Sequence, residues 1–180
     1  KTVFVTHMLR IPLPHWASWL ERTGIFSTKR LIRKFTFCFI PDLQSRDNLS
    51  GKLSHDIEIP VNARYIGILS RFRPPHSSAA IIDYSSFCTV ILSGPEPQRS
   101  IMKQKLTVLL KSNGEESVIL EGKPADISEK RKEGNITYLS HVPATEMREL
   151  IMGSRYIISR SGYTTLMELA SLGKRALIIP

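Results

Sequence analysis

A chain of 180 residues, of which 42% are hydrophobic and 23% charged, has the composition of a soluble globular protein rather than a disordered or fibrous one. No apolar run approaches the roughly 18 residues that a transmembrane helix needs, and the first residues lack a secretory signal, so we expect a cytoplasmic protein. The formal net charge is +9, and residues 1–74 carry most of it, with 12 Lys and Arg against 5 Asp and Glu.

The basic excess of residues 1–74 favours an anionic partner, such as phosphate groups, an acidic lipid surface or nucleic acid. A solvated basic face explains it equally well. No nucleic-acid recognition motif accompanies the charge, so we expect no nucleic-acid partner.

The two ends of the sequence lie beside apolar, strand-like stretches, residues 2–5 and 176–179. Natural termini normally lie in exposed, weakly ordered segments. We therefore expect a piece of a longer protein, incomplete at both ends.

The first part of the chain predicts three strands, over residues 2–6, 36–40 and 65–69. Between the first two, residues 16–34 form a basic amphipathic stretch, which Gly24 and Ser27 are expected to break. This stretch is either a crossover helix packed on a sheet or a segment that lies on a membrane surface.

A segment rich in Arg, Pro and Ser follows, as is typical of a connection between domains. The sequence therefore predicts a first domain over residues 1–72, a linker over 73–86 and a second domain over 87–180.

In the second domain, apolar β-branched runs alternate with helical segments, the pattern of parallel strands joined by helices. The predicted strands are residues 89–92, 117–120, 136–139, 156–158 and 176–179, and the predicted helices are 98–111, 144–152 and 164–172. The charged segment 128–134 is expected to be a surface excursion. The predicted fold class is α/β, with a Rossmann-like series.

The most informative motif lies where the strand at 156–158 gives way to a small-residue turn and a helix. Ligands of α/β sheets collect at the carboxyl ends of strands, where helix N-termini offer N–H groups. Ser161, Gly162, Thr164 and Thr165 fit an anion site there. Glu168 could accept hydrogen bonds from two ribose hydroxyls. The alternative is a capping box, in which Thr165 and Glu168 only close the start of the helix.

A second candidate site is the Gly- and Pro-containing turn after residues 89–92. Gly94 would allow a close approach of the backbone to phosphate, and Arg99 could bind phosphate with two N–H groups. The alternative is an ordinary turn between a strand and a helix.

A third group of candidates lies at strand ends in the first part. His7 follows the first predicted strand, and Asp42 follows the second. A histidine there is either an acid–base group or a structural residue. The loop 49–55 is small, polar and basic, and it either cradles a phosphate or is a mobile turn.

Residues 156–180 resemble the donor-binding signature of GT-B glycosyltransferases, and are most similar to the bacterial cell-wall N-acetylglucosaminyltransferase family (glycosyltransferase family 28 C-terminal-like). In that family a strand ends in an Arg-Ser-Gly turn, and a Glu six residues after the Gly binds the ribose. Arg160, Ser161, Gly162 and Glu168 match this pattern. Residues 90–99 resemble the first strand and loop of the same domain, without its several glycines.

The resemblance implies two Rossmann-like domains of GT-B type. It implies transfer of a sugar from a nucleotide-diphosphate donor, a UDP-sugar, to an acceptor hydroxyl, with inversion and without a metal ion. No cofactor is implied, because the nucleotide sugar is a substrate. The acceptor is expected to be lipid-linked or membrane-associated, with the protein at the inner face of the membrane. The alternatives are a non-catalytic nucleotide-binding domain and a nucleotide-sugar epimerase.

Overall fold

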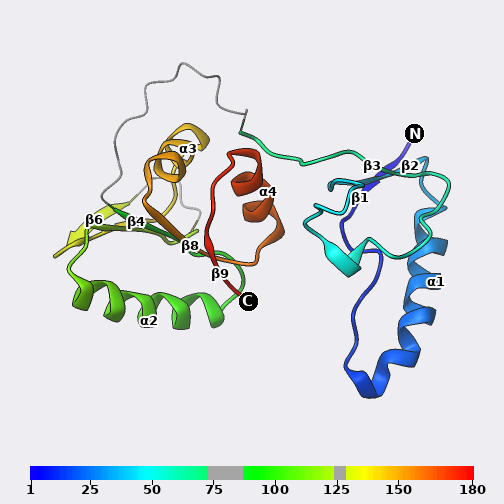
Figure 1. Ribbon diagram of the computed structural model, residues 1–180, viewed down its shortest axis with the longest axis horizontal. Coiled ribbons are helices and arrows are strands. Elements are labelled where there is room, and N and C mark those ends of the chain that lie inside the picture. Colours follow the sequence, from blue (N-terminus) through cyan, green and yellow to red (C-terminus); the bar gives the residue numbers. More distant parts are fainter. Residues whose placement is uncertain (73–86, 124–128) are drawn as a thin grey trace. The chain divides into compact units, whose positions relative to one another are not determined.

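The computed structural model describes residues 1–72, 87–123 and 129–180. The chain divides into two compact units, residues 1–69 and 70–180, each built on its own sheet (Figure 1). The predicted linker, residues 73–86, lies outside the described residues.

The first unit is a parallel sheet of three strands in the order β1-β2-β3. Its strands are β1 (Val3–Val5), β2 (Phe37–Ile40) and β3 (Ala63–Tyr65). A 3-10 helix, η1 (His15–Leu20), and the helix α1 (Glu21–Ile32) connect β1 to β2, and a short 3-10 turn, η2 (Gly51–Leu53), precedes β3. The core of this unit consists of Leu9, Ile32, Cys38, Ile40 and Ala63.

The helix α1 differs from the expectation for this stretch. It continues through Gly24 and Ser27, and the break falls between Leu20 and Glu21, where the 3-10 turn becomes α-helix. Gly24 costs an isolated helix roughly 1 kcal/mol relative to Ala, a penalty small enough for the rest of the helix to absorb.

The third strand is displaced from its predicted position at residues 65–69. After Tyr65 the chain leaves the strand: Gly67 takes a φ of 80°, and its N–H donates to the carbonyl of Asp42. The apolar run that suggested a strand over 65–69 is therefore the exit from the sheet.

The second unit contains a sheet of six strands in the order β6-β7-β5-β4-β8-β9. All neighbouring pairs are parallel except β6 with β7. The strands are β4 (Cys88–Ile91), β5 (Ser117–Leu120), β6 (Lys130–Glu133), β7 (Ile136–Leu139), β8 (Tyr156–Arg160) and β9 (Leu177–Ile179). The predicted α/β class with a Rossmann-like series is confirmed.

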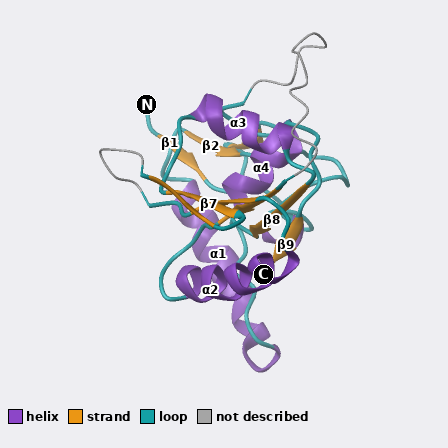
Figure 2. Cartoon of the chain, turned by 90° about the vertical axis from the view of Figure 1, so that its left-hand side faces the viewer, coloured by secondary structure: helices purple, strands orange, loops and turns teal. Residues whose placement is uncertain are grey.

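Helices cover both faces of this sheet. Helix α2 (Gln98–Asn113) packs Met102, Leu106 and Leu110 on one face, while α3 (Ala144–Gly153) and α4 (Tyr163–Ser171) pack on the other. Figure 2 shows α2 on one side of the strands and α3 with α4 on the opposite side. The left-handed conformation of Gly114 ends α2, as the sequence predicts.

The charged segment predicted as a surface excursion contains a strand. Residues 130–133 form β6, which pairs antiparallel with β7 across a turn at Gly134, where φ is 59°. Its four side chains are exposed, so no alternation of apolar and polar residues marks it. Residue 128 lies outside the described residues.

The connectivity creates a crevice beside β4. From β4 the chain passes through α2 to β5, and it later returns through α3 to β8 on the opposite side of β4. Strand order therefore reverses between β4 and β8. In open α/β sheets this reversal, at the carboxyl ends of the strands, is where ligands bind.

Candidate functional site

A pocket of about 310 Å³ lies at this reversal point. The turn after β4 and the junction of β8 with α4 form its walls, so the structure brings together two stretches that the sequence analysis treated separately. Its lining residues are Ser93, Gly94, Pro95, Arg160, Ser161, Gly162, Tyr163, Thr164 and Thr165.

Two glycines allow the walls to approach each other. Gly94 has a φ of 96°, and a Cβ built there would lie 2.4 Å from Nη1 of Arg160. A Cβ on Gly162 would lie 3.1 Å from the hydroxyl of Ser93. Arg160 donates from Nη1 to the carbonyl of Ser93 at 3.4 Å, which ties the end of β8 to the turn after β4.

The pocket contains an unsatisfied polar atom. The hydroxyl oxygen of Ser93 is buried and has no hydrogen-bond partner among the described residues. A buried hydroxyl without a partner is costly, so such an atom calls for an explanation, a bound ligand among them.

The N-terminus of α4 points N–H groups to the same place. Gly162 is its N-cap, and no side chain caps the helix start. Uncapped N–H groups and the positive end of a helix dipole favour an anion. With the Arg160 guanidinium and the hydroxyl of Thr165, they form a set of donors suited to phosphate oxygens.

Glu168 does not form the capping box that the sequence left open. Helix α4 begins at Tyr163, so Glu168 lies in its second turn, and no side chain makes a cap hydrogen bond. The carboxylate is buried and pairs with Nε of Arg71 at 2.7 Å. Burial raises the pKa of Glu168, and the charge and hydrogen bond of Arg71 oppose that rise.

Arg71, the partner of Glu168, is not among the residues that the sequence singles out. It also lines a second cavity of about 310 Å³, on the same side of the sheet as Glu168's helix. A charged residue close to prolines is usually exposed to solvent, so the local sequence does not distinguish Arg71 from an ordinary surface arginine. The other lining residues of this cavity are Ile91, Leu92, Leu120, Gly122, His141, Val142 and Met147.

Arg99 is not among the described residues that line the pocket at Ser93. Its guanidinium contacts Glu96 at 2.8 Å and donates to the carbonyl of Gly122 at 3.1 Å. The guanidinium at the pocket is therefore that of Arg160, whereas Arg99 fastens the start of α2 to the turn after β5.

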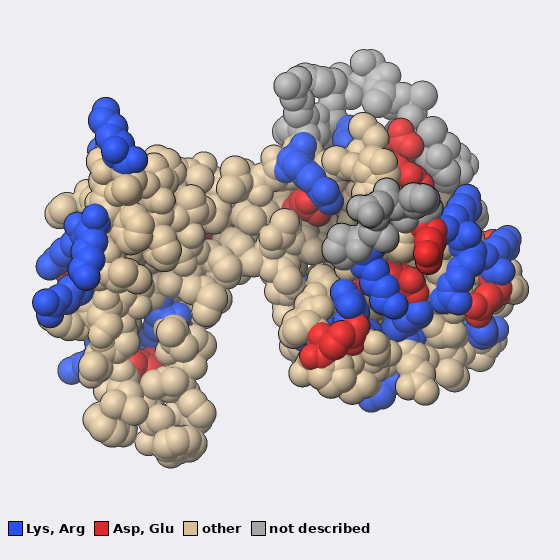
Figure 3. Space-filling model, turned by 180° about the vertical axis from the view of Figure 1, so that it is seen from behind, with Lys and Arg blue, Asp and Glu red and all other residues tan. Residues whose placement is uncertain are grey.

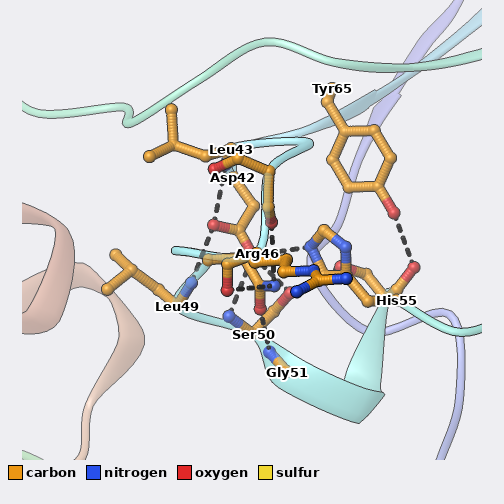
Figure 4. A network of polar contacts seen from close by, with 11 residues as sticks. Asp42, Leu43, Arg46, Leu49, Ser50, Gly51, His55 and Tyr65 are labelled. Carbon is orange, nitrogen blue, oxygen red and sulfur yellow. Dashed lines mark hydrogen bonds and ion pairs between the residues drawn. The ribbon is translucent and has the colours of Figure 1, made fainter.

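In the first unit, Asp42 is the centre of a polar network at the end of β2 (Figure 4). Its carboxylate accepts hydrogen bonds from the N–H groups of Leu43, Leu49 and Ser50 at 2.8 to 2.9 Å, and from the hydroxyl of Ser50. Nε2 of His55 lies 3.3 Å away. Burial would raise the pKa of Asp42, but these hydrogen bonds lower it to about 2.

This network shows that the loop 49–55 is neither a phosphate cradle nor a mobile turn. The N–H groups of Leu49 and Ser50, which could have cradled a phosphate, are donated to Asp42 instead. The loop is anchored further where Tyr65 stacks on His55 and donates its hydroxyl to the carbonyl of Ser54. It is a fixed turn built around an internal carboxylate.

His7 lies after β1, at the same edge of the sheet as Asp42. It is half-buried; burial lowers the pKa of its imidazole, and the charge of Asp42 opposes this effect. His7 and Asp42 are therefore close enough to interact electrostatically, as two groups at neighbouring parallel strand ends should be.

The basic excess of the first unit lies on its surface. In Figure 3 the first unit shows Lys and Arg with little acidic surface, whereas the second shows both signs side by side. No helix of the described chain is long and apolar enough to cross a membrane. Across residues 1–72, 87–123 and 129–180, no group of three or more His, Cys, Asp or Glu is arranged to hold a metal ion.

Comparison with known proteins bears on the second unit. Residues 98–180 match the family model of the glycosyltransferase family 28 C-terminal domain. The match runs from α2 to the end of the chain and includes Arg160, Gly162 and Glu168. No curated protein and no solved structure gives a significant match to the chain.

Proposed function

We propose that this chain, whose residues 98–180 match the C-terminal domain of glycosyltransferase family 28, transfers a sugar from a UDP-sugar to an acceptor hydroxyl. Glycosyltransferase activity, with a nucleotide-sugar donor and an acceptor, follows from the family. The uridine nucleotide, the inversion of the anomeric carbon and the independence of a metal ion are the parts that we propose.

The observation that carries the proposal is the pocket between the turn after β4 and the start of α4. Its unpaired Ser93 hydroxyl, the Arg160 guanidinium and the uncapped N–H groups of α4 suit a diphosphate. When the bond from sugar to diphosphate breaks, negative charge develops on the leaving oxygen. Donors fixed in advance around that charge stabilise the transition state, which is how the reaction can proceed without a metal ion.

The rest of the nucleotide would extend from this pocket toward Arg71. Glu168 would accept hydrogen bonds from the ribose hydroxyls. The cavity lined by Leu92, Leu120 and Val142, with Arg71 and His141 at its polar positions, has a volume of about 310 Å³, which is large enough for a nucleobase. Diphosphate, ribose and base would then follow the carboxyl ends of the strands.

For the acceptor we propose His7 as the general base. Burial lowers the pKa of its imidazole, although the charge of Asp42 opposes this effect, and a lowered pKa favours the neutral ring that a base must have. Asp42 is a poor base. Its carboxylate accepts several hydrogen bonds and has a pKa of about 2, so it takes up a proton only weakly.

A lipid-linked or membrane-associated acceptor is supported by the surface of the first unit. Trp16, Trp19 and Phe26 are 82%, 72% and 65% exposed, and Arg22, Lys29 and Arg30 lie on the same stretch. Aromatic side chains beside basic ones favour the surface of an anionic membrane.

The experiment that tests the donor site is calorimetric binding of UDP, ADP and GDP to the full chain with and without EDTA. Glu168→Gln is the informative variant, and Glu146→Gln, an exposed carboxylate on α3, is its matched control. We expect UDP to bind the wild type and Glu146→Gln equally, and Glu168→Gln at least about tenfold more weakly, the cost of a lost hydrogen bond to a charged group.

Three outcomes contradict parts of the proposal. If no nucleotide binds, the donor site is wrong. If Glu168→Gln binds UDP like the wild type, the ribose role fails. If EDTA abolishes binding, the independence of a metal ion fails. Transfer of radiolabelled sugar from UDP-sugars, lost in His7→Ala but kept in His15→Ala, tests the base.

A further inference from the structure

The segment that opens the second unit is fixed to α4. Ser171 donates its hydroxyl to the hydroxyl of Ser70 at 2.8 Å. Two residues after Ser70, Phe72 is buried in the same core cluster as Leu169 of α4 and Leu172, the C-cap of that helix. Arg71 lies between these two anchors, so its backbone has a defined position beside α4.

The Arg71 side chain reaches from this fixed backbone to Glu168. Its Nε lies 2.7 Å from Oε1, and its guanidinium carbon lies 5.1 Å from the centre of the Phe72 ring. The two side chains differ in exposure, 51% for Arg71 against 5% for Glu168. Arg71 thus presents one N–H to a buried carboxylate and the rest of its guanidinium to a cavity.

Arg71 is the only cation among the described residues that shifts the titration of Glu168. Burial raises the pKa of this carboxyl, and the charge and hydrogen bond of Arg71 are what oppose it. Two other cations of the unit have different partners: Arg160 donates to the Ser93 carbonyl and Lys174 to the Ser154 carbonyl. Among the described residues, further charged or titratable groups of the unit include His141, which lines the cavity, and Glu146, Arg148 and Glu149 of α3.

We propose that Arg71 is a positioning residue for the donor: by binding Oε1 of Glu168 through Nε, it orients the carboxylate so that Oε2 accepts hydrogen bonds from the ribose hydroxyls. The inference rests on the proposed function, since it needs a ribose at Glu168. A buried carboxylate without a cation takes up a proton more readily, and a protonated carboxyl offers the ribose a weaker acceptor.

In the opposite role, Arg71 would compete with the ribose for the Glu168 carboxylate. If Arg71 fills the place of the ribose, its removal should strengthen nucleotide binding. A purely structural ion pair would change the stability of the unit and leave binding unaffected. The sign of the effect on affinity, and its dependence on pH, separate the three roles.

The experiment measures binding of UDP and of 2′-deoxy-UDP to the full chain between pH 5 and pH 8. The variants are Arg71→Gln, Arg71→Lys and Glu168→Gln. Arg155→Gln, which removes an exposed arginine from the other end of β8, is the matched control. Far-UV circular dichroism and thermal melts show that each variant is folded before its affinity is compared.

We expect the wild type and Arg155→Gln to prefer UDP over 2′-deoxy-UDP throughout this range. In Arg71→Gln the preference should fall by about tenfold at the acidic end, the cost of losing a charge-assisted hydrogen bond. It should recover as the pH rises and Glu168 ionises. Arg71→Lys should recover part of it, because it restores the charge without the planar guanidinium.

Four results would overturn the inference. If Arg71→Gln is folded and binds UDP more tightly, Arg71 occupies the place of the ribose and competes with it. If Arg71→Gln keeps the wild-type preference for UDP at every pH, the ion pair of Arg71 and Glu168 is purely structural. If the wild type binds UDP without preferring it over 2′-deoxy-UDP, the inference fails while the proposed function stands. If the wild type binds neither nucleotide, the proposed function fails, and the inference with it.

Discussion

Arg160 occupies the space into which a side chain on Gly94 would grow, with Nη1 only 2.4 Å from the position of a Cβ. The same Nη1 donates to the carbonyl of Ser93, whose hydroxyl has no hydrogen-bond partner in the described part of the chain. The turn after β4 and the end of β8 are therefore matched in shape as well as in polarity. A change in one of them must alter the other.

Gly94→Ala tests this match. The added methyl group should push the Arg160 guanidinium away from Ser93 and weaken UDP binding. It should also lower the free energy of unfolding by about 1–2 kcal/mol, because φ is 96° there. Gly114→Ala is the control, since Gly114 also has a positive φ but no atom within 4 Å of a Cβ. Equal UDP affinity in the two variants would show that Arg160 has no part in binding.

Ser93→Ala should separate stability from binding. Because the hydroxyl is buried and no described residue bonds to it, its removal should leave the melting temperature unchanged or raise it. UDP affinity should nevertheless fall. Ser154→Ala is the comparison: that hydroxyl donates to Thr89 at 2.6 Å, so its loss should lower stability by about 1 kcal/mol. A loss of stability in Ser93→Ala as large as that in Ser154→Ala would contradict the assignment.

Asp42 predicts a dependence of stability on pH. Its pKa is lowered from 3.8 to about 2 in the folded protein, so the folded state favours the ionised form. The stabilisation is complete above about pH 4 and is lost as the pH falls toward 2.

Asp42→Asn should remove this acid-sensitive contribution, on the order of 2 kcal/mol at neutral pH, since one pKa unit corresponds to about 1.4 kcal/mol. Urea unfolding followed by Trp fluorescence between pH 2 and pH 7 measures it, because Trp16 and Trp19 both lie in the first unit. Asp47→Asn, at an exposed carboxylate of the same loop, is the control. Parallel loss of stability with acid in wild type and Asp42→Asn would sink the prediction.

Gly24→Ala should stabilise the first unit. Gly24 lies inside α1, and no atom lies within 4 Å of a Cβ built there, so the methyl group meets no obstacle. The gain is expected to be about 0.5–1 kcal/mol, from the smaller entropy of the unfolded chain. The same unfolding measurement applies, and a decrease in stability would mean that the helix does not continue through this residue.

Much of the second unit could be predicted from its sequence, because its parallel strands are short apolar runs between well-marked turns. Two helix boundaries are marked in the sequence: α2 ends at Ser112-Asn113-Gly114, and α3 begins directly after Pro143. The strand at 130–133 could not be predicted, since a strand that exposes all its side chains carries no apolar pattern. Its pairing depends on β7, which is a tertiary effect.

The candidate site was predicted in part. The motif around Arg160 and Gly162 pointed to the edge of the sheet where the structure has the pocket at Ser93, because position relative to strand ends is a property of the local sequence. The partners of individual side chains were not predictable. Arg71 meets Glu168 from 97 residues away, and Arg99 turns to its own neighbour Glu96. Such pairings are decided by which groups the fold places within reach.

The strand Lys130–Glu133 also affects how the protein behaves in a crowded solution. It is an edge strand of the six-stranded sheet, and the unpaired backbone groups of an edge strand can pair with a strand of another molecule. Its four residues, Lys-Arg-Lys-Glu, are all charged and all exposed. Charged side chains on an edge strand oppose such pairing. This border of the sheet is thereby protected against aggregation by strand addition.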